Sequence, residues 1–111
     1  MRASLLRLLR TRGHVATGAR SGSQAIELAQ QLQPHVIIVD IVMREGGGLD
    51  IARAIKSDPM LAMIPIIALT GSPDLVQDCA ALFRAVLTKP CPSATLFRAI
   101  EALEAVGTPL Q

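Results

Sequence analysis

Three short apolar runs separated by amphipathic segments constrain the fold of this chain most. The runs are Val36–Ile41, which is apolar apart from Asp40, Ile64–Leu69 and Ala85–Thr88. Runs of this kind, rich in β-branched residues, are typical of strands buried on both faces of a sheet. Because amphipathic helical patterns lie between them, the sequence predicts an α/β fold with a parallel sheet covered by helices on both sides.

The remaining segments complete this alternation. The stretch His14–Ala19 is a weak candidate for a further strand and brings the expected number of strands to four. Apolar residues at helical spacing, with Ser, Gly and Pro at the boundaries, predict five helices. They cover the residues before Gly13, Ser21 or Ser23 to Leu32, Leu49–Ser57, Asp74–Phe83, and a last segment capped by Ser93. One domain over residues 1–106 and a short tail over residues 107–111 therefore account for the chain.

The composition suits a single domain with an aliphatic core. The chain has 111 residues, of which 50% are hydrophobic and 18% are charged. Aromatic residues make up 2% of it, too few to stack on the bases of single-stranded nucleic acid, and the net charge of +2 is too small to indicate nucleic-acid binding. The longest apolar run, Met60–Leu69, is too short to span a bilayer. Cys79 and Cys91 lack metal-ligand spacing and are interpreted as free thiols in a reducing cytoplasm.

The first twenty residues allow two interpretations. They contain five arginines and no acidic residue, a composition typical of a mitochondrial presequence. Alternatively, they begin with a surface helix in which Leu5, Leu8 and Leu9 share one face and Arg7 and Arg10 lie opposite. We favour the surface helix, because the segment fits the alternation of strands and helices without a gap.

Polar residues lie at the carboxyl ends of the three apolar runs. Asp40 lies near the end of the first run, Thr70 follows the second and Lys89 follows the third. In open parallel sheets, ligands bind in a crevice outside the carboxyl ends of the strands. We therefore expect these three side chains to converge on one crevice.

The chemistry of these three side chains suits phosphoryl transfer. An aspartate carboxylate can attack a phosphoryl group and become an aspartyl phosphate, which adds about −1.5 to −2 charge. The ammonium group of Lys89 can contact the phosphoryl oxygens, and the hydroxyl group of Thr70 can move to meet them. A divalent cation normally reduces the repulsion between the carboxylate and the incoming phosphate, and Mg²⁺ prefers such oxygen ligands.

Three stretches of the sequence resemble the motifs of a known family. VIIVDIVM (residues 36–43), IPIIALTGS (residues 64–72) and VLTKP (residues 86–90) look like the phosphoacceptor, switch and lysine motifs of the bacterial response-regulator receiver domain, the domain of chemotaxis regulators. The motifs occur in the family's order, and the resemblance covers nearly the whole chain. It implies a flavodoxin-like, doubly wound parallel sheet.

The resemblance also implies roles and partners. Asp40 would be the phosphorylation site, Thr70 the switch hydroxyl and Lys89 the phosphate contact, and the Lys89–Pro90 peptide bond would be cis. The implied function is two-component signal transduction in the cytoplasm, with no enzymatic activity beyond phosphoryl transfer and autodephosphorylation. A sensor histidine kinase or a phosphotransfer protein would donate the phosphoryl group, and the switched face would bind a downstream protein. Neither nucleic acid nor a membrane is an expected direct partner.

One part of the family pattern is absent from this sequence. Receiver domains begin with a strand that ends in two acidic residues, which hold Mg²⁺, whereas this sequence begins with the segment that resembles the family's first helix. Asp40 and the backbone carbonyl of Val42 are then the expected protein ligands of the metal. We therefore expect this chain to bind Mg²⁺ weakly.

The missing strand also implies a gap in the sheet. In the receiver strand order it lies between His14–Ala19 and Val36–Ile41, which would leave roughly 9–10 Å between these two segments. The natural protein begins upstream, or the weak strand shifts across to pair with Val36–Ile41, or another chain supplies a strand by edge pairing. We rank the first alternative highest, and the last one corresponds to a homo-oligomer formed through exposed strand edges.

Two other functions compete with the phosphoacceptor. A receiver fold that has lost its chemistry would act as a phosphorylation-independent interaction module, in which Asp40→Asn leaves partner binding unchanged. A phosphatase with an Asp nucleophile, as in haloacid dehalogenase-like enzymes, needs a second Asp two residues after the nucleophile. Val42 occupies that position, which makes the phosphatase the weaker alternative.

Overall fold

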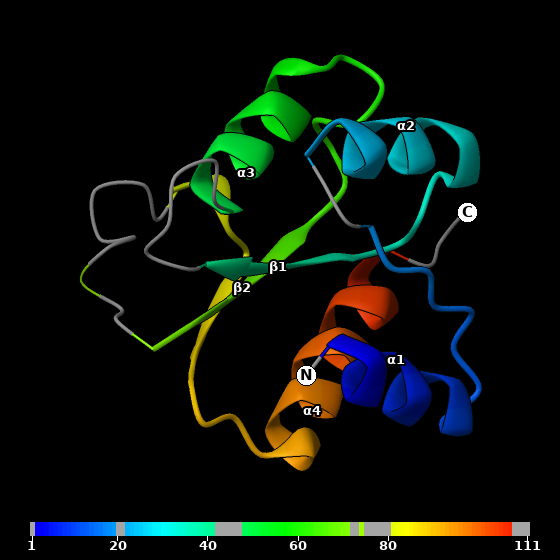
Figure 1. Ribbon diagram of the computed structural model, residues 1–111, viewed down its shortest axis with the longest axis vertical. Coiled ribbons are helices and arrows are strands. Elements are labelled where there is room, and N and C mark those ends of the chain that lie inside the picture. The colour runs from blue at the N-terminus through cyan, green and yellow to red at the C-terminus, as the bar shows by residue number, and fades with distance from the viewer. Residues whose placement is uncertain (1, 20–21, 42–47, 72–73, 75–80, 108–111) are drawn as a thin grey trace.

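The computed structural model describes residues 2–19, 22–41, 48–71, 74 and 81–107, which form helices on both sides of a parallel sheet (Figure 1). Helices α1 (Arg2–Thr11) and α4 (Ser93–Gly107) cover one face of the sheet. Helices α2 (Gly22–Leu32) and α3 (Gly48–Ser57) cover the other. The predicted α/β class is therefore confirmed. Among the described residues, no helix is long and apolar enough to cross a membrane.

The three apolar runs form the strands of the sheet. Strands β1 (Ile37–Ile41), β2 (Ile66–Thr70) and β3 (Ala85–Thr88) lie in the order β1-β2-β3, and both pairs are parallel. The central strand β2 is buried at all of its residues, which explains why its sequence is apolar until Thr70.

The prediction of a fourth strand at His14–Ala19 is wrong. These residues adopt no strand conformation, and the described sheet has three strands. A strand is stable only when a neighbour satisfies its backbone groups, and here the carbonyl of Ala16 accepts hydrogen bonds from the side chain of Arg10 instead, at 3.2 Å from Nε and 2.8 Å from Nη2. The expected alternative in which this segment shifts across to pair with β1 is therefore not observed either.

The end of α1 follows the sequence prediction. Gly13 has a φ of 87°, which glycine adopts without the steric cost of a Cβ atom. Its N–H donates to the Arg10 carbonyl at 3.0 Å, and the N–H of His14 donates to the Leu9 carbonyl at 3.1 Å. This pair of hydrogen bonds is the Schellman arrangement, which ends the helix and turns the chain towards the sheet.

The later helices agree with prediction in part. Helix α3 ends at Ser57, directly before the predicted breaker Asp58–Pro59. The predicted helix Asp74–Phe83 lies largely outside the described residues. Ser93 is the first residue of α4 and not its cap, because the carbonyl that accepts the first helical hydrogen bond, from Leu96 at 3.2 Å, belongs to Pro92. The predicted tail starts at the last residue of α4, and residues 108–111 lie outside the described part of the chain.

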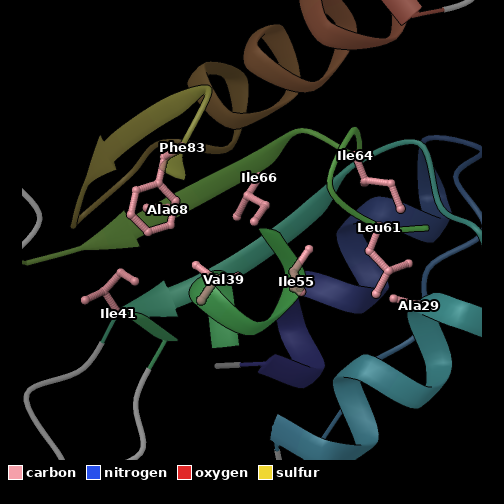
Figure 2. Packing of buried hydrophobic residues seen from close by; sticks show 10 residues of the cluster. Ala29, Val39, Ile41, Ile55, Leu61, Ile64, Ile66, Ala68 and Phe83 are labelled. Carbon is pink, nitrogen blue, oxygen red and sulfur yellow. The ribbon is translucent and has the colours of Figure 1, made fainter. Parts of the chain in front are cut away.

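Two apolar clusters hold the helices to the sheet. Successive residues of β2 alternate between them, with Ile66 and Ala68 in one cluster and Ile67 and Leu69 in the other. The first cluster packs β1 and β2 against α3, as Figure 2 shows for Val39, Ile55 and Ile66. The second packs β2 against α4 and Leu9 of α1. The strands therefore form a rigid platform whose carboxyl ends carry the polar residues discussed next.

Candidate functional site

The strand register brings the three polar positions to one edge of the sheet. Thr70, the last residue of β2, lies beside Ile41 of β1 on one side and Thr88 of β3 on the other. Asp40 lies one residue before Ile41, and Lys89 one residue after Thr88. The backbone N–H of Lys89 donates to the carbonyl of Thr70 at 2.8 Å, which fixes where the lysine leaves the sheet.

Asp40 and Lys89 form an ion pair across the end of the sheet. The Nζ atom of Lys89 donates to Oδ1 of Asp40, although their strands are separated by β2. The side chain of Asp40 is 45% exposed and that of Lys89 is 24% exposed. The carboxylate is therefore open to an incoming reactant while a cation is already held beside it.

Thr70 reaches the same edge in a different environment. Its side chain is completely buried, and it is the one buried polar residue among those described. The structure thus places Asp40, Thr70 and Lys89 on three adjacent strand ends, joins Lys89 to Asp40 through its side chain and joins Lys89 to Thr70 through its backbone.

The peptide bond after Lys89 is cis, as the resemblance implied for Lys89–Pro90. Pro90 itself is exposed, and α4 begins at Ser93. The short connection carries the chain from the site into the helix that covers the α1 face of the sheet (Figure 1).

The described residues do not fit a magnesium site. Among them, no group of three or more His, Cys, Asp or Glu side chains is arranged to hold a metal ion. Asp40 already has the ammonium group of Lys89 as its counter-ion. The other expected ligand, the carbonyl of Val42, lies outside the described residues.

Lys56 is a partly buried cation that sequence reasoning did not identify. Its Nζ atom donates to the carbonyls of Ala62 and Ile64, each at 2.9 Å, and so fastens the connection between α3 and β2. Burial lowers the pKa of Lys56 below its ordinary value of 10.5, and the positive charge of Arg84 lowers it further. The sequence carries no signal for this role, because a lysine in the last turn of a helix is ordinarily exposed.

A second unanticipated arrangement joins α1 to α4. The guanidinium group of Arg12 lies 4.3 Å from the ring centroid of Phe97. The ring of His14 stacks on the same phenyl ring, with the centroids 6.4 Å apart and the planes 10° from parallel. Phe97 is therefore the aromatic anchor that holds the end of α1 against α4.

The amino-acid sequence matches a family model. Residues 1–101 match the model of the response regulator receiver domain. The chain is 33% identical over 102 residues to protein PilH of Pseudomonas aeruginosa, a match that covers 89% of this chain and 84% of PilH. It is 36% identical over 64 residues to the polar-differentiation response regulator DivK of Brucella ovis, which covers 58% of this chain and 52% of DivK.

Solved structures agree with these sequence matches. The signal receiver domain of a signal transduction histidine kinase from Syntrophus aciditrophicus superposes with a TM-score of 0.86 at 26% identity, over 99% of this chain and 86% of that chain. The chemotaxis protein CheY4 of Vibrio cholerae superposes with a TM-score of 0.81 at 27% identity, over 92% of this chain and 88% of that chain. The chain therefore belongs to the response regulator receiver domain family of two-component signalling.

Proposed function

We propose that this chain accepts a phosphoryl group on the carboxylate of Asp40 and thereby switches a protein-binding face. The observation that carries this proposal is the ion pair between Asp40 and Lys89, in which an exposed carboxylate at a strand end has a cation fixed beside it. A donor can reach such a carboxylate from solvent. A carboxylate that served the stability of the core would be buried.

The transfer step exchanges one bond to phosphorus for another. A carboxylate oxygen of Asp40 attacks the phosphorus of the donor, an O–P bond forms, and the bond from phosphorus to the donor atom breaks. The electron pair of the broken bond stays on the donor, which is a histidine nitrogen or the carboxylate oxygen of a small acyl phosphate. The charge on the aspartyl phosphate is then partly neutralised by Lys89.

The proposed switch uses Thr70. Its backbone carbonyl accepts a hydrogen bond from the backbone N–H of Lys89. If the side chain of Lys89 moves towards a phosphoryl group and the backbone of Lys89 follows, the movement reaches the last residue of β2. The hydroxyl group of Thr70 would then turn towards the phosphoryl oxygens. The new contacts favour one of two pre-existing conformations of the surrounding loops, which is how the site would reach a protein-binding face.

The donor class follows from the family. Receiver domains interact with histidine kinases or phosphotransfer proteins and with downstream targets, and a relative described above is part of a signal transduction histidine kinase. We propose a donor of one of these two kinds, a protein target downstream, and a location in the cytoplasm, where such donors act. Nucleic acid and membrane are not proposed as direct partners.

Magnesium is proposed to bind weakly. Receiver domains generally bind Mg²⁺ in an acidic pocket, but the described residues hold no group of three or more His, Cys, Asp or Glu side chains that could bind a metal ion, and the carboxylate of Asp40 is paired with Lys89. A metal ion would have to compete with this cation for the carboxylate.

The test is phosphorylation by acetyl phosphate, read by intact mass with and without added Mg²⁺. The wild-type chain is expected to gain one phosphoryl group, and Asp40→Asn is expected to abolish the gain. The matched control is Asp50→Asn, because Asp50 is an exposed acid on α3. Thr70→Ala should keep the phosphoryl group and lose the switching of the binding face.

The outcome that overturns the proposal is a phosphoryl group that survives Asp40→Asn. The same holds if neither acetyl phosphate nor a histidine-phosphorylated donor modifies the wild-type chain. In that case the chain is better described as a phosphorylation-independent interaction module, a second candidate that the missing acidic cluster among the described residues favours. For that candidate, Asp40→Asn should leave the affinity for a protein partner unchanged.

A further inference from the structure

The amine of Lys56 is held in a fixed position at the end of α3. Its Nζ atom donates to the carbonyls of Ala62 and Ile64, each at 2.9 Å. No other hydrogen bond or ion pair joins this nitrogen to a described residue. An ammonium group has three N–H donors, so the third one faces neither carbonyl. Lys56 is half-buried, and part of its side chain is therefore open to solvent.

This geometry suits the neutral form of the amine as a nucleophile. A neutral amine has two N–H groups and one lone pair, so it can keep both hydrogen bonds while the lone pair takes the third direction. Burial and the charge of Arg84 lower the pKa of Lys56, and the neutral form is therefore reached at a lower pH than for an ordinary lysine. Lysines that are activated in this way act as nucleophiles in proteins.

A second cation lies next to Lys56. The backbone N–H of Arg84 donates to the carbonyl of Ile66 at 2.9 Å, two residues along the chain from the Ile64 carbonyl that binds Lys56. The charge of Arg84 is near enough to act on the amine of Lys56. Arg84 is exposed, so its guanidinium group can meet a molecule that approaches from solvent.

No ion pair among the described residues includes either of these two cations. Asp58 is the nearest acid to Lys56 along the chain, but both of its carboxylate oxygens are engaged. One accepts from the side chain of Gln30 and the other from the backbone N–H of Met60, each at 2.8 Å. The two positive charges therefore attract an anion from solvent, and a guanidinium group matches the geometry of a phosphate.

We propose that Lys56 is a site of acylation by small acyl phosphates, with Arg84 binding the phosphate group of the donor. The lone pair of Nζ attacks the carbonyl carbon of the donor, a C–N bond forms, and the C–O bond to the phosphate breaks. The electron pair of that bond leaves with the phosphate, and the nitrogen gives one proton to solvent. The amide has a single N–H, so one of the two carbonyls loses its hydrogen bond and the connection between α3 and β2 is held less firmly.

Acetyl phosphate tests the site, with Lys89 as the comparison within the same chain. The Nζ atom of Lys89 donates to Oδ1 of Asp40, so an electrophile reaches that nitrogen only after the ion pair opens. Peptide mapping after incubation with acetyl phosphate should therefore show more acetyl group on Lys56 than on Lys89. Asp40→Asn should raise the acetylation of Lys89 and leave that of Lys56 unchanged.

Two donors test the contact with Arg84. Arg84→Gln should slow the acetylation of Lys56 by acetyl phosphate roughly two- to fivefold more than acetylation by the neutral ester para-nitrophenyl acetate, the range for one exposed ionic contact. The change in the pKa of Lys56 affects both donors, so the comparison removes it. The matched control is Arg98→Gln, because Arg98 is exposed on α4, which covers the other face of the sheet from α3. It should leave both rates unchanged.

The inference is overturned if Lys56 gains no more acetyl group than Lys89, or if Arg84→Gln slows both donors equally. It does not depend on the phosphorylation of Asp40, because acylation breaks a carbon–oxygen bond of the donor and phosphorylation breaks a bond to phosphorus. Intact mass distinguishes the two products. A chain that gains the acetyl group without a phosphoryl group leaves this inference standing, and a chain that gains the phosphoryl group alone leaves the proposed function standing.

Discussion

At the scale of single residues, Gln33 has a backbone conformation that non-glycine residues rarely adopt. It is the described non-glycine residue with a positive φ, at 49°, and its N–H donates to the Ala29 carbonyl at 2.9 Å just after α2. An L-residue pays a steric cost in this left-handed region that glycine avoids. We expect Gln33→Gly to raise the free energy of unfolding by about 0.5–1 kcal/mol in chemical denaturation.

A neighbouring glutamine provides the control for this prediction. Gln31 is exposed in the last turn of α2, where helical geometry disfavours glycine. Gln31→Gly should lower the free energy of unfolding by about 1 kcal/mol. If both substitutions destabilise the protein to the same extent, the backbone of Gln33 does not carry the cost assigned to it.

The protonation of Lys56 makes the stability of the protein depend on pH in the alkaline range. Burial, aided by the charge of Arg84, holds the pKa of Lys56 in the folded state below its value of 10.5 in the absence of such effects. Between the folded-state pKa and 10.5, the unfolded chain binds more protons at Lys56 than the folded chain does, so the free energy of unfolding rises with pH in that window. At neutral pH the charged lysine costs stability, and this cost disappears as the pH approaches 10.5.

The measurement is the difference in unfolding free energy between the wild-type chain and Lys56→Met from pH 7 to pH 11. We expect the free energy of unfolding of the wild-type chain to rise relative to that of the variant as the pH rises. Arg84→Gln should move the start of this gain to higher pH, because it removes a like charge. Arg53→Met, a substitution of an exposed residue on α3, should give a difference that does not vary with pH in this range. A flat curve for Lys56→Met would contradict the assignment.

At the scale of elements, the end of α1 depends on Gly13. A Cβ atom at this position would contact nothing within 4 Å, so the cost of Gly13→Ala comes from its φ of 87° alone. We expect the substitution to lower the free energy of unfolding by about 1–2 kcal/mol. Gly71 also has open space where a Cβ atom would lie but no positive φ, so Gly71→Ala should change stability by less than about 0.5 kcal/mol. If Gly13→Ala and Gly71→Ala changed the free energy of unfolding equally, the positive φ of Gly13 would not explain the effect.

At the scale of the whole molecule, β2 couples the two apolar clusters. Ile66 and Ile67 are both fully buried, and they face opposite sides of the sheet. We expect Ile66→Ala and Ile67→Ala each to lower the free energy of unfolding by about 2–5 kcal/mol. Because one strand carries both clusters, each variant should unfold in a single calorimetric transition at a lower temperature.

The variant Ile66→Val tests the same core position with a smaller change in side-chain volume. It should cost about 0.5–1.5 kcal/mol, since it removes one methylene group and keeps the shape of the side chain. A variant that shows two separate transitions would mean that the two faces of the sheet unfold independently. That result would contradict the coupling assigned to β2.

The three strands could be predicted from the sequence because burial on both faces leaves little choice of residue. β3 has the predicted bounds. β1 starts one residue later than predicted, and β2 starts two residues later and ends one residue later, at Thr70. The end of α1 was equally predictable, since Gly13 supplies a backbone conformation that other residues avoid. These features are local. Each depends on the residues of one segment and on the solvent from which they are removed.

The sequence by itself determined the α/β class, the order of the strands along the chain and the candidate residues at their carboxyl ends. The tertiary structure decided whether each segment found a partner. His14–Ala19 is no strand, because it pairs with no strand of the described sheet and the side chain of Arg10 holds its Ala16 carbonyl. The contact of Lys89 with Asp40 and that of Lys56 with two carbonyls likewise join residues from different segments of the chain. Such contacts depend on how the strands and loops pack together, which no single segment specifies.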